Sequence, residues 1–452
     1  MASAPPSSWA TASAASRWPR ASEEVAVLLS GGVDSSVALR LLHDAGVRCR
    51  AFYLRIWLED EQAHASRGEC PWEEDWACAS AVCEQAGVPL EAVSLQDEYS
   101  QLVVEYLISE AAAGRTPNPD IMCNSRIKFG AFLDKVGRHF AAVASGHYAR
   151  STVPTPSCAM VLDTRATRSA QDRSAAYATA MVAAHGDASK TSVLKERELE
   201  ARVGQDGSGV ASAELPAPAQ LLMSADPHKD QTYFLSQLRQ DQLERVLFPI
   251  GHLPKSEVRA LAEELQLPNR QRKDSQGICF LGQLNYDDFL RDHLGERPGP
   301  VFEFETKQVI GTHRGLWFHT VGQRRGLVPV LTNAFAAKGP WYVVKKDVEN
   351  NALHVSREYT AADKSRNAFN ANSLNWLSGN PPAADGEQIP LQVKVRHGAQ
   401  MHDALVTVHE GGARVGVQLS SRDKGLAPGQ FAAFYDGDVC LGSGVITEEV
   451  HS

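Results

Sequence analysis

A run of small and polar residues, S-G-G-V-D-S-S at 30–36, has the composition of a turn that binds an anion. Five apolar residues precede it at 25–29, and an amphipathic stretch follows it and ends at Gly46. This pattern predicts a buried parallel strand, a turn and a helix that ends at a glycine. Backbone N–H groups in such a turn point toward whatever lies at the helix N-terminus. We therefore expect a phosphate to bind there.

Two common phosphate-binding motifs do not fit this turn. No Gly-Lys-Ser/Thr follows it at the Walker A spacing, and G-x-G-x-x-G is absent. An ordinary strand–helix turn capped by serine would account for the Gly-Gly pair alone. The full string, however, resembles the PP-loop of ATP pyrophosphatases. That resemblance implies that the loop holds pyrophosphate while ATP is split between its α- and β-phosphates.

Cys123 lies in a polar and cationic stretch rather than in an apolar run. It follows the prolines of P-N-P-D (117–120), from which we expect a rigid loop and a helix that begins near residues 124–125. A thiol at a helix N-terminus ionises more easily, and Arg126 and Lys128 would strengthen this effect. A small buried side chain is the alternative interpretation of such a cysteine.

A second cysteine, Cys279, follows a cationic segment that contains Arg270, Arg272 and Lys273. Two such cysteines beside a nucleotide-binding loop suggest sulfur chemistry, in which one carries a persulfide and the other assists its release.

Several further motifs occur in order along the chain. They are P-N-P-D-x-x-C-N (117–124), S-G-H-Y (145–148), K-D-Q-T-Y-F-L (229–235), F-P-I-G (248–251), K-D-S-Q-G-I-C-F (273–280), H-T-V-G-Q-R-R-G-L (319–327) and W-Y-V-V-K-K-D (341–347). As an ordered set they resemble the tRNA-specific 2-thiouridylase family, over residues 24–150 and 225–448.

The resemblance implies ATP and Mg²⁺ as cofactors and assigns roles to particular residues. ATP would be bound by Leu28, Leu29, Ser30, Gly31, Gly32, Val33, Asp34, Ser35, Leu54 and Gly146. The target uracil would lie among Asn118, Pro119 and Asp120. The persulfide would form on Cys279, with Cys123 as its catalytic partner. Contacts with tRNA would come from Lys229, Asp230, Gln231, Arg396 and His397.

The same resemblance implies a reaction. The C2 oxygen of the wobble uridine would be adenylated, sulfur from the Cys279 persulfide would attack C2, and AMP would leave. A Cys123–Cys279 disulfide would remain and need reduction, and Asp120 would position the base or move a proton. Implied partners are the lysine, glutamate and glutamine tRNAs and a persulfide donor such as a cysteine desulfurase or relay protein. The basic stretches 270–273 and 323–325 are candidate phosphate contacts.

Two other function classes remain open from the residues. An amide-forming synthetase of the PP-loop type would adenylate a small carboxylate or a purine carbonyl, and it would need no cysteine pair. A tRNA-binding protein without catalysis would need neither the intact loop nor both cysteines.

Composition limits the remaining choices. With 452 residues the chain is long enough for two or three domains, and its net charge of −9 argues against binding nucleic acid by bulk electrostatics. No apolar run is long enough to span a membrane, so no membrane partner is expected. The eight cysteines form no C-x-x-C pair, and we expect Cys70, Cys78 and Cys83 to pack rather than to bind a metal.

The order of the elements predicts an α/β fold with a doubly wound parallel sheet over 23–285, interrupted by a surface insertion at 151–223. A small mixed domain that contacts tRNA is expected at 286–350, and an antiparallel β-barrel at 351–449. Residues 1–22 are rich in Ala and Ser and resemble an organellar transit peptide, for chloroplast or mitochondrion. An unstructured tail on a cytoplasmic protein is the alternative.

Overall fold

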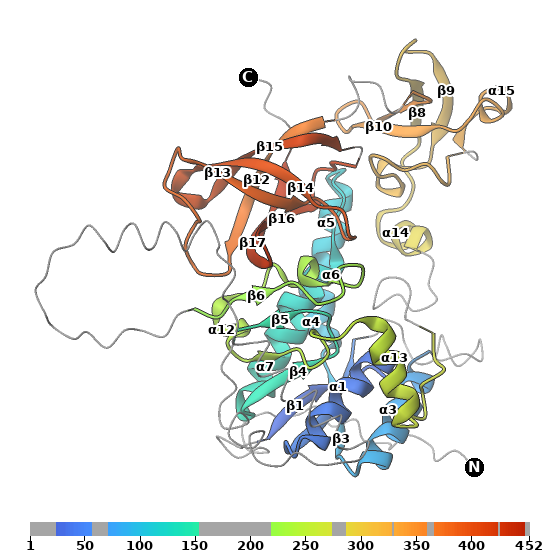
Figure 1. Cartoon of the computed structure of the whole chain (residues 1–452). Helices are drawn as coiled ribbons and strands as arrows, with labels where there is room; N and C mark the ends of the chain where they lie inside the picture. Colours follow the sequence, from blue (N-terminus) through green and yellow to red (C-terminus); the bar gives the residue numbers. More distant parts are fainter. Residues whose placement is uncertain are drawn as a thin grey trace, which may run out of the picture.

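The computed structural model describes residues 24–56, 71–152, 218–273, 286–327, 330–358, 366–423 and 425–447. Along the chain it shows a domain built on a parallel sheet, a smaller middle domain and a closed β-barrel (Figure 1). The expected leader, most of the expected insertion, Cys70 and Cys279 lie outside the described residues.

The first domain contains a five-stranded parallel sheet with the order β3-β2-β1-β4-β7, which confirms the predicted fold class. Its strands are β1 (Val25–Leu28), β2 (Cys49–Arg55), β3 (Leu90–Ser94), β4 (Ala142–Ser145) and β7 (Val246–Leu247). Side chains alternate along β1, so Val25 and Val27 pack on one layer of helices while Ala26 and Leu28 pack on the other.

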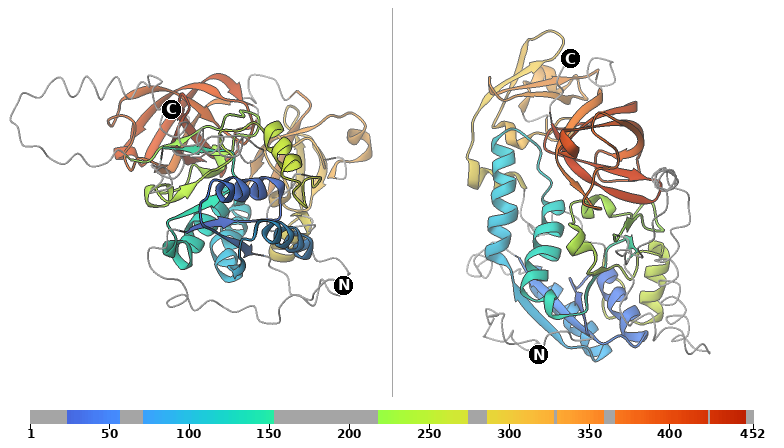
Figure 2. Two further views of the ribbon diagram at one scale, coloured as in Figure 1. Left: turned by 60° about the horizontal axis from the view of Figure 1, so that its bottom comes forward. Right: turned by 90° about the vertical axis from the view of Figure 1, so that its left-hand side faces the viewer.

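Helices cover both faces of this sheet. One face carries α1 (Val33–Asp44) and α3 (Pro71–Ala86), and α13 (Lys255–Glu264) packs against α1. The other face carries two helical rods, each containing a π-helical stretch, that run from the sheet toward the barrel (Figure 2). Their segments are α4 (Gln96–Tyr99), η1 (Ser100–Val104) and α5 (Glu105–Ala112), then α6 (Pro119–Met122), η2 (Cys123–Ala131) and α7 (Phe132–Lys135).

The second rod begins earlier than the sequence pattern predicts. The expected start near residues 124–125 is wrong, because α6 already begins at Pro119. Proline is favourable at the first helical position, where its missing N–H would have no partner in any case. Asn118 caps the helix, and its Oδ1 accepts from the Ile121 N–H at 3.3 Å. Cys123 therefore lies in the second turn of a continuous helix rather than at its N-terminus.

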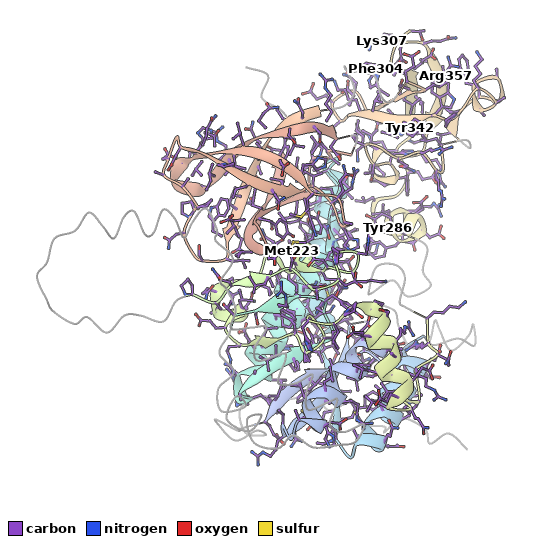
Figure 3. All side chains as sticks on the ribbon, in the orientation of Figure 1. Met223, Tyr286, Phe304, Lys307, Tyr342 and Arg357 are labelled. Atoms are coloured by element: carbon purple, nitrogen blue, oxygen red, sulfur yellow. The ribbon has the colours of Figure 1, made fainter. Side chains whose placement is uncertain are left out.

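The middle domain consists of a helix and a four-stranded sheet with the order β10-β11-β8-β9. Its elements are α14 (Tyr286–Leu294), β8 (Gly299–Glu303), β9 (Val309–His313), η4 (Leu316–Phe318), α15 (Asn333–Ala336), β10 (Tyr342–Asp347) and β11 (Ala352–Ser356). Tyr286 lies nearest the first domain and Lys307 at the outer end (Figure 3). Since β11 pairs with β8, this domain extends past the expected boundary at residue 350.

The C-terminal part is a six-stranded antiparallel barrel, closed because β12 pairs with both β15 and β17. Its strands are β12 (Arg366–Trp376), β13 (Gln388–Lys394), β14 (His402–His409), β15 (Arg414–Asp423), β16 (Phe431–Asp436) and β17 (Val439–Thr447), with the short turn η6 (Glu410–Gly412). The short strands β5 (Arg150–Ser151) and β6 (Leu221–Leu222) extend β17 outward. The two ends of the expected insertion are thus anchored beside the barrel.

The barrel is attached to the first domain through buried polar contacts. Lys394 Nζ of β13 donates to Asp230 Oδ2 at 2.7 Å, and both side chains are almost completely buried. Asp230 precedes α11 (Thr232–Leu235), which is followed by the short helix α12 (Gln240–Leu243). The short turn η3 (Gly137–His139) connects α7 to β4. The Met223 N–H, in the strip between barrel and sheet (Figure 3), donates to the Asp438 carbonyl at 2.8 Å.

Within the described ranges, no helix is both long and apolar enough to cross a membrane.

Candidate active site

The S-G-G-V-D-S-S loop forms the turn between β1 and α1, as the sequence predicts. Its serines bond within the loop: the Ser35 and Ser36 hydroxyls donate to the Gly32 carbonyl at 3.0 and 2.9 Å. Gly31 has a φ of +76°, and a side chain there would overlap the Asp75 carbonyl of α3. The residues Leu28 and Leu29 are buried at the end of β1, and Ser30 is exposed. The loop is therefore a compact, preformed turn at a helix N-terminus.

Two distant side chains fix the Gly31 carbonyl. Asn269 Nδ2 donates to it at 2.7 Å and Arg272 Nη1 at 3.1 Å, and Arg272 also pairs with Asp75. Burial raises the pKa of the Asp75 carboxyl, although the Arg272 guanidinium opposes that shift. In the expected phosphate-binding stretch 270–273, Arg272 thus binds groups of the protein itself. Arg270 of the same stretch pairs with Glu263.

Asp34, in the first turn of α1, is held by two partners. Lys255 Nζ donates to its two carboxylate oxygens at 2.7 and 2.9 Å, and the Tyr148 hydroxyl donates at 3.0 Å. Gly146, just past β4, approaches the loop so closely that a Cβ there would lie 2.6 Å from the Ser35 nitrogen. Leu54 is half-buried on β2. These contacts place Gly146 directly against the expected nucleotide-binding residues, whereas Leu54 lies on the neighbouring strand.

Cys123 is 1% exposed and belongs to the main apolar core, where the π-helical stretch η2 begins. Such stretches often occur at functional sites. Pro119, four residues earlier, is buried, while Asn118 and Asp120 are half-buried. The Asn118 N–H donates to the Tyr106 hydroxyl at 3.3 Å, and burial raises the pKa of Tyr106 to about 12. The pairing of Cys123 with Cys279 falls outside the described residues and stays a prediction.

The expected tRNA contacts gather where the first domain meets the barrel. Lys229 is exposed, and the His397 ring stacks on Phe234 with ring centres 4.6 Å apart. Burial lowers the pKa of His397, and the charge of Lys394 lowers it further. Arg396 Nη2 pairs with Asp423 at 2.6 Å.

The other two expected tRNA residues are engaged within the protein. Asp230 is buried and accepts from Lys394, from the Ser224 N–H and from the Thr232 hydroxyl. Gln231 Oε1 accepts from the Tyr148 N–H at 2.9 Å. These two residues are thus placed to hold the segment that presents Lys229.

Sequence reasoning missed Gln430, which joins the barrel to the segment before Cys123. Its Nε2 donates to the carbonyls of Thr116 and Pro117 at 3.2 and 3.1 Å, and its Oε1 lies 3.4 Å from Asn118 Nδ2. Gln430 lies in no quoted motif, so no local signal marked it. Lys255 was also missed, although the preceding F-P-I-G motif marks the turn that leads to it.

The described residues contain no group of three His, Cys, Asp or Glu side chains placed to hold a metal ion. Cys83 packs against α1 and the sheet, and burial raises its pKa to about 12. Cys78, on the same helix, is half-exposed. These two cysteines therefore contribute to the packing and the surface of α3.

Comparisons with known proteins match the chain over almost its entire length. Family models described as a tRNA methyl transferase HUP domain, a tRNA methyl transferase PRC-barrel domain and an aminomethyltransferase beta-barrel domain match residues 23–180 with 209–283, 287–357 and 366–446. A tRNA-specific 2-thiouridylase MnmA from Parabacteroides distasonis is 37% identical over 94% of this chain and 99% of its own. One from Porphyromonas gingivalis is 36% identical over the same shares.

Proposed function

The chain belongs to the tRNA-specific 2-thiouridylase family, and from this premise we propose how its residues divide the work of replacing the C2 oxygen of the wobble uridine with sulfur. The enzyme is a tRNA-uridine 2-sulfurtransferase. The observation that carries the proposal is the preformed 30–36 loop, which combines the loop glycines with the close approach of Gly146.

ATP is the proposed source of activation, with its polyphosphate on the backbone N–H groups of residues 30–35. The loop fits this role because Gly31, with a φ of +76°, lets α3 approach it closely, and Gly146 lies against Ser35 with no side chain between them. Bound ATP would supply an AMP group that turns the C2 oxygen into a leaving group. Mg²⁺ would arrive with the phosphates, and Asp34 is the carboxylate at the loop. The loop donors orient the phosphates and stabilise the charge that develops on pyrophosphate.

Cys279 is proposed to carry the persulfide, and Cys123 to release its outer sulfur. The outer sulfur attacks C2 of the adenylated base, and AMP leaves with the C2 oxygen. The Cys123 thiolate then attacks the inner sulfur of Cys279. The S–S electron pair passes to the thiouridine sulfur, and a Cys123–Cys279 disulfide forms. A thiol reductant must supply two electrons before the next turnover.

The uridine is proposed to lie beside Asn118, Pro119 and Asp120, and the bound tRNA to reach Lys229, Arg396 and His397. A base in the single-stranded anticodon loop can be flipped out of its stack at modest cost. The same proposal includes the substrates, which are the lysine, glutamate and glutamine tRNAs. It includes a cysteine desulfurase or relay protein as the persulfide donor, and an organellar location for the mature chain.

A labelled persulfide donor distinguishes the two cysteines. Cys279→Ser should take up no sulfur, because a serine hydroxyl cannot form a persulfide. Cys123→Ser should take up sulfur yet fail to thiolate tRNA, and Cys78→Ser, on the surface of α3, should keep full activity. Mass spectrometry of trapped intermediates reads the result. Sulfur on Cys123 but not on Cys279 would reverse the assignment, and sulfur on neither would favour an amide-forming synthetase.

A further inference from the structure

The phosphate-binding loop contains no cation of its own. Residues 28–35 read L-L-S-G-G-V-D-S, so Asp34 is their one charged side chain. A carboxylate at that place repels a polyphosphate, and the helix dipole offsets only about 0.3–1 kcal/mol of such repulsion. A positive charge from another part of the chain would therefore strengthen the binding of pyrophosphate here, beside the charge of any Mg²⁺ that arrives with it.

Lys255 places an ammonium group at this position. Its Nζ lies 2.7 and 2.9 Å from the two carboxylate oxygens of Asp34. The Lys255 side chain is 15% exposed and that of Asp34 is 30% exposed. The ammonium also lies 5.7 Å from the centre of the Tyr148 ring, whose hydroxyl donates to the same carboxylate. Lys255 is thus fixed at the first turn of α1, next to the loop donors.

The fold brings Lys255 there through two separate contacts. Lys255 is the first residue of α13, which lies beside α1 (Figure 1) and buries Val258 and Leu261 in the same cluster as Val33 and Val37. In addition, the Lys255 N–H donates to Asp226 Oδ2 at 3.0 Å. The position of the ammonium is therefore set by helix packing as well as by its ion pair with Asp34.

Arg272 also brings a positive charge to the loop, but its guanidinium has other partners. Its guanidinium binds the Gly31 carbonyl and Asp75, so it lies where the loop presents an acceptor. A phosphate must bind where the loop presents N–H donors. Lys255 pairs with Asp34 in the first turn of α1, where the helix N–H groups lack partners within the helix.

We propose that Lys255 is a phosphate-binding residue of the ATP site and contacts the β- and γ-phosphates. This inference rests on the proposed ATP-dependent function. An ammonium on a flexible stem has three donors and is shared between Asp34 and the incoming phosphates. When the uridine oxygen attacks the α-phosphorus, the bond to the β-phosphate oxygen breaks and its electron pair stays on pyrophosphate. Lys255 keeps its proton and offsets that charge.

Nucleotides with different numbers of phosphates test the proposal. Lys255→Met and Lys255→Gln should each weaken the binding of ATP and of inorganic pyrophosphate by about 10- to 100-fold, as expected for loss of a charged contact. Binding of AMP should stay within about threefold, because AMP lacks both phosphates that Lys255 contacts. Lys255→Arg should restore part of the ATP affinity. The glutamine variant keeps a donor for Asp34, so it guards against misfolding of the methionine variant.

Lys135→Met is the matched control, because Lys135 is also an ion-paired lysine of the first domain, with Glu98 as its partner. It should bind ATP like the wild type. Equal loss of ATP and AMP affinity in the Lys255 variants would mean that Lys255 merely shapes the loop, and unchanged ATP affinity would mean that it stays with Asp34. Either result overturns the proposal. Failure of the wild-type enzyme to bind ATP would instead refute the proposed function.

Discussion

At the scale of single residues, Gly146 gives the sharpest test of the nucleotide site. A methyl group at this position would lie 2.6 Å from the Ser35 nitrogen and 2.7 Å from its Cα. We expect Gly146→Ala to displace the Ser35 N–H from the phosphate and to raise the KM for ATP at least about tenfold, since one charged hydrogen bond contributes about 1.5–3 kcal/mol. Steady-state kinetics at varied ATP concentration measure the effect.

The tRNA affinity of Gly146→Ala provides the control. It should remain within about twofold of the wild type, because the expected tRNA contacts lie at the barrel side of the domain. An unchanged KM for ATP would show that Ser35 takes no part in nucleotide binding.

Residues in contiguous motifs could be located from the sequence, whereas their distant partners could not. The loop at 30–36 occupies its expected place because one short string determines both the strand and the helix around it. Asn269 and Lys255 contact that string from 238 and 221 residues away, and no local pattern indicates such a contact. The start of the helix at Pro119 was mispredicted because proline disrupts the interior of a helix but is favourable in its first turn.

At the scale of elements, the buried ion pair between β13 and the segment before α11 should control how firmly the barrel is attached. Asp230→Ala leaves the Lys394 ammonium buried without its partner, so we expect a loss of about 3–5 kcal/mol in the free energy of unfolding. The double variant D230N/K394M should recover most of it, because no buried charge remains and an amide oxygen still accepts from Ser224. Urea unfolding measures both variants.

The same variant separates two roles of Asp230. If this residue contacts tRNA directly, Asp230→Ala will weaken tRNA binding while the unfolding transition stays where it is in the wild type.

A second buried charge makes the middle domain sensitive to pH. Lys346 of β10 donates to the His319 carbonyl at 2.9 Å, and burial lowers its pKa to about 8. Between about pH 8 and 10.5 the unfolded chain therefore binds a proton that the native state does not, so stability rises with pH. Across this pH window the free energy of unfolding of the wild type should therefore rise by up to about 3 kcal/mol relative to that of Lys346→Met.

Unfolding of both proteins in urea at several pH values gives this difference. A difference that does not change with pH would mean that the Lys346 ammonium stays hydrated in the native state.

Helices and strands could be predicted where a run of periodic hydrophobic residues was long. They could not be predicted where a strand pairs with a partner far along the chain. Alternating strands and helices gave the parallel sheet. In contrast, β11 was assigned to the barrel by its position in the sequence, although it pairs with β8 of the middle domain. The two-residue strands β5 and β6 carry no detectable period. They pair with each other, and the second partner of β6, β17, is more than two hundred residues farther along the chain.

At the scale of the whole molecule, the net charge of −9 means that tRNA affinity depends on a few local contacts. Arg324 and Arg325 are exposed on the middle domain. We expect the double charge reversal R324E/R325E to weaken tRNA binding and to reduce the slope of log K against log salt by about 1–2, since each lost phosphate contact contributes about 0.7–0.9. The KM for ATP should not change. Filter binding at several salt concentrations measures the slope.

Arg239→Glu serves as the control, because Arg239 is an exposed arginine of the first domain, paired with Asp241. Its salt slope should equal that of the wild type. Equal weakening in both variants would mean that tRNA responds to overall charge rather than to the 323–325 stretch.

The pairing of β5 with β6 bears on how freely this enzyme can change length. Antiparallel hydrogen bonds fix both ends of the connection between Ser151 and Leu221, and β17 holds the pair against the barrel. The free energy of closing a connection between two fixed ends grows with the logarithm of its length, by about 0.6 kcal/mol for each doubling. Lineages can therefore add or remove dozens of residues here with little loss of stability, and a fluorescent reporter domain spliced into this connection should leave folding intact.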